Sequence, residues 1–281
     1  MLKVIVPENP EVPGSCAAPT QHRHPRVRWW VHLVIIGSYP IIIGLLSLGR
    51  SGPQQPALAQ NAPGLLHACA FQLGVFGLIF LLGWVASRAS AEDLWLPWRP
   101  GLWPIPLGIG YSIGLRVALG LVAAFVMICL LLSRFIKPDD LQHLAQQNQP
   151  DVRALVDVRA LRNDPLYYWL NLTLVSFVVA GLREELWRAG VLAALKKLWP
   201  TLFGSRPGEI AAVGMAAAIF GFGHVSQGPV AIAAAALLGF GLGTIMVVHR
   251  SIWPAVIAHG FFDATTFAVL PWLFEKLPHL R

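Results

Sequence analysis

Apolar runs long enough to cross a lipid bilayer are the feature that most constrains the fold of this chain. Several of them exceed the 18 or so residues that a helix needs to span the hydrocarbon core. Only 12% of the 281 residues are charged, and the mean hydropathy is +0.60, whereas soluble domains carry about 25% charged residues. Because lipid satisfies no backbone hydrogen bonds, the runs must form helices. We therefore predict an all-α, polytopic membrane protein.

The order of apolar and polar segments predicts about seven transmembrane helices, with six to eight as the range. The predicted spans cover residues 29–48, 65–86, 105–132, 167–198, 210–224, 230–248 and 252–274. The polar, proline-rich and arginine-rich first 28 residues lack the apolar core of a signal peptide, so they are predicted to be a flexible tail before a membrane domain of residues 29–281. In the polar stretch 138–165, Leu155, Val158 and Leu161 fall at helical spacing and predict a short amphipathic helix on the membrane surface.

The charges favour membrane topology over nucleic-acid binding. The formal charge of +7 comes from Lys and Arg residues that flank apolar spans, and their bias among the short loops places the N-terminus in the cytoplasm. Cys16, Cys69 and Cys129 are widely spaced and include no CxxC pair. The sequence therefore indicates neither a disulfide framework nor a zinc site built from cysteines.

Ionisable residues inside predicted spans are functional candidates, because each costs several kcal/mol to bury in lipid. The fourth span contains Glu184 and Glu185, which point about 100° apart on a helix, so one cavity can receive only one of them. Arg188 follows within pairing distance of either glutamate, and Arg183 precedes them. An ion-pair cluster at a helix end is the structural alternative to a catalytic pair.

Two histidines and an aspartate follow in later spans. His224 ends the fifth span, and alone it would be an ordinary histidine at a helix end. His259 and Asp263 lie one helical turn apart on the same face of the seventh span. That spacing suits two groups acting on one atom, two metal ligands, or a hydrogen bond that accommodates a buried histidine. Arg116 in the third span is interpreted as a snorkelling or ion-paired side chain.

Together, these residues resemble the CAAX-protease and bacteriocin-processing (CPBP) family of intramembrane proteases, which includes CAAX prenyl endopeptidases and bacterial Abi-type proteins. The family pattern is Glu-Glu-x-x-x-Arg, then Phe-x-x-x-His, then His-x-x-x-Asn or Asp. The matching residues are Glu184 and Glu185, Phe220 and His224, and His259 and Asp263. The resemblance covers residues 165–274, which we take as the catalytic core. One departure is that the family arginine would fall at Ala189, whereas this chain has Arg188.

The resemblance implies an intramembrane endopeptidase in which Glu184 and His224 activate a water molecule. His259 and Asp263 would stabilise the oxyanion or position the substrate, and Glu185 would have a structural role, paired with Arg188 or Arg183. The family has also been described as metal-dependent, and His224, His259 and Asp263 form a known type of zinc ligand set. Because the chain has no His-Glu-x-x-His helix, a mechanism without a bound cofactor is preferred.

Two other classes of function stay open: a proton-coupled transporter, in which buried carboxylates and histidines form a relay, and a non-catalytic membrane scaffold or immunity protein. The absence of a paired inverted repeat disfavours the transporter. A protease could take a prenylated C-terminus, a peptide precursor or a membrane-protein segment as its substrate. Simple span boundaries put His224 near the outer face and Glu184 and His259 toward the cytoplasm, so a shared site requires the fifth span to be shallow or broken, or its boundaries to differ.

Overall fold

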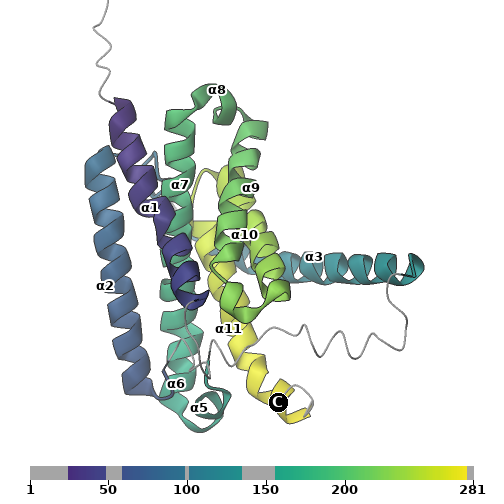
Figure 1. Cartoon of the computed structure of the whole chain (residues 1–281). Helices are drawn as coiled ribbons and strands as arrows, with labels where there is room; N and C mark the ends of the chain where they lie inside the picture. The colour runs from purple at the N-terminus through teal and green to yellow at the C-terminus, as the bar shows by residue number, and fades with distance from the viewer. Residues whose placement is uncertain (1–24, 49–58, 99–100, 135–155, 277–281) are drawn as a thin grey trace, which may run out of the picture.

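The computed structural model describes residues 25–48, 59–98, 101–134 and 156–276. Within this part of the chain the structure is helical and contains no strand, which confirms the predicted all-α class. Figure 1 shows α1, α2, α7, α9 and α10 running side by side, with α11 behind them and α3 extending away to one side.

The helices follow the chain in this order: α1 (Pro25–Leu48), α2 (Ala62–Ser87), α3 (Pro104–Leu132), α5 (Val158–Asn163), α6 (Pro165–Leu170), η3 (Asn171–Leu182), α7 (Arg183–Leu198), α8 (Pro200–Phe203), α9 (Arg206–Phe222), η4 (Val225–Gln227), α10 (Pro229–His249) and α11 (Trp253–Lys276). Six helical segments are long and apolar enough to cross a membrane, by length and composition. They are α1, α2, α3, the continuous run of α6, η3 and α7, and then α10 and α11. The protein is therefore a polytopic membrane protein.

Residues 25–28, which the sequence assigned to the N-terminal tail, are part of α1 (Pro25–Leu48), and residues 1–24 lie outside the described part of the chain. The predicted fifth span, 210–224, corresponds to α9, which has 17 residues and ends at Phe222. At 1.5 Å per residue its length is about 25 Å, so α9 falls short of the other spans.

The predicted short helix is present as α5, with Asp157 as its N-cap. The Asp157 side chain accepts hydrogen bonds from the backbone N–H groups of Arg159 and Ala160 at 2.8 and 2.9 Å, a favourable arrangement at a helix start. Leu161 is buried in a protein cluster with Tyr167, so the apolar face of α5 packs against the protein. Leu155 lies outside the described residues.

The middle of the fourth span has π-helical geometry. η3 covers 12 residues directly before α7, and the Ser176 hydroxyl donates to the carbonyl of Asn171, five residues earlier, at 2.6 Å. Regular α-helix resumes at Arg183, one position before the glutamate pair. π turns inside helices are rare and often occur at functional sites.

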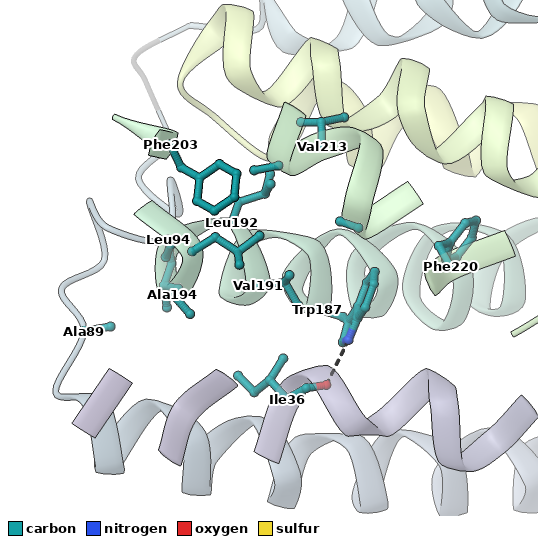
Figure 2. Packing of buried hydrophobic residues seen from close by; sticks show 14 of the residues in the cluster. Ile36, Ala89, Leu94, Trp187, Val191, Leu192, Ala194, Phe203, Val213 and Phe220 are labelled. Atoms are coloured by element: carbon teal, nitrogen blue, oxygen red, sulfur yellow. Dashed lines mark hydrogen bonds between the residues drawn. The ribbon is translucent and has the colours of Figure 1, made fainter. Parts of the chain in front are cut away.

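The largest hydrophobic cluster joins α1, α2, α7 and α9 around Trp187 (Figure 2). The indole N–H of Trp187 donates to the carbonyl of Ile36 at 2.9 Å, so its only polar atom is satisfied although the side chain is buried. Ile36 and Phe220 pack in the same cluster. The helix that carries both glutamates is thereby held against its neighbours.

α3 projects from the bundle, and its first half packs on α10 and α11, where Arg116 adds polar contacts to the apolar ones. Every side chain from Gly120 to Cys129 is exposed, as expected for a helix surrounded by lipid. Arg116 donates hydrogen bonds to the carbonyl of Phe262 and to the hydroxyls of Thr265 and Thr266 on α11, and its guanidinium lies 4.1 Å from the centre of the Phe262 ring. Groups on α11 thus provide hydrogen-bond acceptors and an aromatic ring for the Arg116 guanidinium.

At one end of the bundle, the carboxylate of Glu209, which lies outside the candidate spans, forms ion pairs with residues of two other segments. Glu209, at the start of α9, accepts hydrogen bonds from Lys196 at 2.9 Å and Arg250 at 2.5 Å. Burial alone would raise the pKa of Glu209, but these two cations bring the pKa below its usual value. A cavity of about 280 Å³ lies beside this cluster, and its lining includes none of the predicted site residues.

Close backbone contact joins η3 to α11. A Cβ atom on Gly181 would lie 2.9 Å from the carbonyl oxygen of Val256, and a Cβ on Gly260 would lie 2.2 Å from the Phe177 ring. Small residues are common where membrane helices pack closely. This contact brings the glutamate-bearing helix next to the histidine-bearing helix.

Gly181→Ala is expected to destabilise the protein by about 1–3 kcal/mol, because its new methyl group meets rigid backbone and overpacking forces the helices apart. Gly214→Ala on α9 is the control, since a Cβ there meets nothing within 4 Å and alanine favours helix. Thermal unfolding in detergent should separate the two variants. Equal stability of both variants would show that the η3 and α11 contact adjusts without cost.

Candidate active site

Glu185 is fully buried, and both of its oxygens are used. Its Oε2 accepts a hydrogen bond from Arg188, three residues later on α7, and its Oε1 lies 3.1 Å from Nδ1 of His259 on α11. Neither Glu185 nor Arg188 has any exposed side-chain surface. Glu185 therefore links the two helices and leaves no oxygen for a substrate or water.

Glu184 has a different environment. Its Oε1 accepts a hydrogen bond from Arg183 at 2.9 Å, while its Oε2 lies 3.7 Å from Nε2 of His259. The side chain is 18% exposed, so water can reach it. Of the two adjacent glutamates, Glu184 is the one with an oxygen available for chemistry.

His259 lies between three carboxylates. Its Nδ1 faces Glu185, and its Nε2 lies 3.7 Å from Asp263 Oδ2 as well as from Glu184 Oε2. Because a carboxylate oxygen only accepts, the contact with Glu185 places a hydrogen on Nδ1. Asp263 is 26% exposed on its side chain, against 4% for His259. The imidazole is thus held in place from inside the protein while Asp263 faces the accessible side.

Phe220 connects His224 to this group. Its ring centre lies 4.8 Å from that of His224 and 6.5 Å from that of His259, and the Arg188 guanidinium lies 5.1 Å from the same ring. The carbonyl of Phe220 accepts a hydrogen bond from Nδ1 of His224 at 3.0 Å. His224 also lies within electrostatic range of Asp263.

The short α9 resolves the expected mismatch in depth. α9 ends at Phe222, and His224 follows in the turn before η4, where a Cβ on Gly223 would lie 3.7 Å from Pro40 in the C-terminal half of α1. Because α9 ends there, His224 packs on Phe220, whose ring also lies beside His259. The structure brings together the predicted residues Glu184, Glu185, His259 and Asp263, with His224 beside them.

The shifted arginine still pairs with the glutamate motif. Arg188 is one position earlier than in the family pattern, yet it lies three positions after Glu185, so both are on one face of α7. Its Nε and Nη2 atoms have no hydrogen-bond partner among the described residues, and the ring of Phe220 covers the group. Each of the three carboxylates has a nearby arginine: Arg183 for Glu184, Arg188 for Glu185 and Arg116 for Asp263.

The described residues do not form a ready-made zinc site. No group of three or more His, Cys, Asp or Glu side chains within this part of the chain is arranged to hold a metal ion. In the set His224, His259 and Asp263, the Nδ1 atoms of both histidines are committed to protein acceptors. Nε2 of His259 lies 3.7 Å from Asp263. Histidines that bind zinc usually donate from the other ring nitrogen to a carbonyl or carboxylate, so these residues could hold zinc only through Nε2 of each histidine, and no step below uses a metal.

A comparison with protein-family models identifies the segment that carries these residues. The family described as Rce1-like, type II CAAX prenyl endopeptidase Rce1-like, matches residues 165–265. This segment is therefore similar to the CAAX protease family, in agreement with the motif residues that it contains. The CAAX protease segment runs from the first residue of α6 into α11, so it contains all the predicted site residues and leaves α1, α2 and α3 outside. The match supports an intramembrane protease of the CAAX type. The chain matches no curated protein and no solved structure.

Two contacts of the site were missed from the sequence. Arg183 was considered only as a partner of Glu185, but it pairs with Glu184. Gln72 on α2 was not singled out, although its Oε1 accepts a hydrogen bond from the other terminal nitrogen of Arg183 at 2.9 Å. An amide within a long apolar run was the available signal, because polar groups in membrane spans seek protein partners.

Proposed function

We propose that the protein hydrolyses a peptide bond close to the membrane, with Glu184 and His224 activating the attacking water. The observation that carries this assignment is the difference between the two glutamates. Both oxygens of the buried Glu185 are occupied, whereas Glu184 keeps Oε2 available and is partly exposed. The match to the CAAX protease segment supports the peptidase class.

His224 has the tautomer that a base requires. Its Nδ1 faces a backbone carbonyl, which can only accept, so the hydrogen lies on Nδ1. In the neutral ring Nε2 then carries the lone pair that can accept a proton from water. Water attacks the scissile carbonyl carbon, its proton passes to Glu184 or His224, and the departing amine takes that proton as the C–N bond breaks.

His259 and Asp263 are proposed to stabilise the oxyanion. With a hydrogen on Nδ1 facing Glu185, His259 can also donate from Nε2 when the ring is protonated. A donor fixed before the reaction stabilises the developing negative charge without a reorganisation cost. Asp263 would hold the imidazole toward the substrate. No bound metal takes part in this mechanism.

The substrate is proposed to be a peptide or protein segment at the membrane, in the simplest case a prenylated C-terminus of the kind named by the family. The bias of basic residues in the short loops supports a cytoplasmic N-terminus.

The test of the peptidase assignment uses purified protein in liposomes with a farnesylated peptide that ends in a CAAX sequence, and with the same peptide lacking the lipid. Mass spectrometry should detect a released C-terminal fragment. If neither peptide is cleaved, nor a panel of unlipidated membrane-segment peptides, the peptidase assignment is overturned in favour of a transporter or scaffold.

Asp263→Asn distinguishes the metal-free mechanism from a zinc mechanism. An asparagine can hold His259 and donate to an oxyanion, so we expect activity within a few-fold of wild type, whereas Asp263→Ala should lose most of it. As a zinc ligand, Asp263 would supply negative charge, and its loss should weaken metal binding. The measurement is the initial cleavage rate with and without prolonged chelation. Loss of activity in Asp263→Asn that excess zinc restores would contradict the metal-free mechanism.

A further inference from the structure

Gln72 connects α2 to the candidate base, although α2 lies outside the segment that matches the protease family. Its Oε1 accepts a hydrogen bond from Nη1 of Arg183 at 2.9 Å, and Nη2 of Arg183 donates to Glu184 Oε1 at 2.9 Å. One guanidinium therefore bridges an amide on a neighbouring helix and the carboxylate at the site. Arg183 is 14% exposed on its side chain, so little water competes for it.

This bridge controls the rotation of the Glu184 carboxylate. A carboxylate on a flexible side chain can turn either oxygen toward the site, or turn both away from it. Because Arg183 holds Oε1, Oε2 is left facing Nε2 of His259. The adjacent Glu185 is instead fixed on both oxygens. Arg183 thus leaves one oxygen of Glu184 without a hydrogen bond, whereas Arg188 and His259 occupy both oxygens of Glu185.

The guanidinium of Arg183 is itself held by two acceptors, Gln72 and Glu184. Its Nε is buried and has no hydrogen-bond partner among the described residues, so the hydrogen bonds to Gln72 and Glu184 set its orientation. If Gln72 offered no acceptor, Nη1 would be free to turn toward Glu184, and the guanidinium could engage both carboxylate oxygens. A two-oxygen pair with arginine is a favoured geometry, and it would occupy the oxygen that the water needs.

We infer that Gln72 and Arg183 are positioning residues for the hydrolytic reaction, with Gln72 restricting Arg183 to one oxygen of Glu184. This inference rests on the proposed function, in which Glu184 is a general base. Neither residue touches the substrate in this assignment, and both act through the Glu184 carboxylate. α2 thereby contributes to the site although it carries none of the family motifs.

The test starts with Gln72→Met, which keeps the length of the side chain and removes the acceptor. We expect kcat on the farnesylated CAAX peptide to fall about 10- to 100-fold, as small misplacements of a reacting group do, with KM within about twofold because substrate contacts are untouched. His67→Met is the control, because His67 is an exposed polar residue on the same helix. It should leave both constants unchanged.

Arg183→Lys separates positioning from charge alone. Lysine keeps the positive charge but lacks the fork that reaches two acceptors, so kcat should fall as it does in Gln72→Met. In the Arg183→Lys background, the added Gln72→Met change should have little further effect, because the two act as one unit. Full activity in Arg183→Lys, or additive losses in the double variant, would overturn the inference.

The two proposals fail in different ways. A wild-type protein that cleaves no peptide contradicts the peptidase assignment itself. An active wild type that is inactivated by Glu184→Gln but unaffected by Gln72→Met sustains the assignment and removes the positioning role. A fall in thermal stability of Gln72→Met with an unchanged kcat per folded protein would make Gln72 a purely structural residue and would also overturn the inference.

Discussion

Glu184→Gln is expected to lower the cleavage rate by about 100- to 10,000-fold, the range that general acid–base catalysis contributes, while the protein stays folded. The amide is nearly the same size as the carboxylate and can still accept a hydrogen bond from Arg183 through its oxygen. It cannot take a proton from water. Because the side chain is partly exposed, its new N–H₂ group is not left without partners, and the folding cost should be small.

The measurement combines initial rates on the farnesylated peptide with thermal unfolding of the same preparation. Glu275→Gln is the matched control, because Glu275 lies near the end of α11 in an exposed pair with Arg162, where ion pairs contribute little. It should keep normal activity and stability. Turnover near the wild-type rate in Glu184→Gln would remove Glu184 from the role of base.

The span pattern could be predicted from the sequence because the bilayer sets the length of an apolar helix. Predicted and observed boundaries agree closely for α2, α3, α10 and α11. The end of α9 was harder to predict. The predicted span ran to His224, whereas the helix ends at Phe222. Hydropathy reports how apolar a run is, but not the depth at which a helix stops. The π geometry of η3 was not predicted from the sequence, in which the whole segment is an apolar helical run.

The candidate residues could be found because charges in apolar spans are rare and their spacing matches a family pattern. The sequence showed that Glu184 and Glu185 face different directions, but it could not show which one faces the site. That depends on where α11 packs: His259 meets both glutamates, and Arg188 closes off Glu185. The contact between Gln72 and Arg183 joins residues far apart in the sequence, so spacing along the chain could not reveal it.

Glu185→Gln is expected to destabilise the protein by about 3–5 kcal/mol, the cost of breaking a buried ion pair by removing one partner. The carboxylate serves Arg188 with one oxygen and His259 with the other. A glutamine has only one oxygen, so one of these two donors would face an N–H₂ group, and the Arg188 charge would be uncompensated. Glu185→Gln and Glu184→Gln should therefore differ: the first lowers stability, and the second lowers turnover.

A double variant tests whether the stranded charge is the cause. In Glu185→Gln with Arg188→Met, the buried cation is gone and an unbranched apolar chain fills much of its space beside Phe220. Replacing both partners of a buried pair by uncharged groups is often far less costly than removing one. The double variant should therefore recover part of the stability that Glu185→Gln loses, measured by denaturant or thermal unfolding in detergent. If the double variant is less stable than Glu185→Gln, the loss comes from packing around Arg188, and the pair is not what holds α7 against α11.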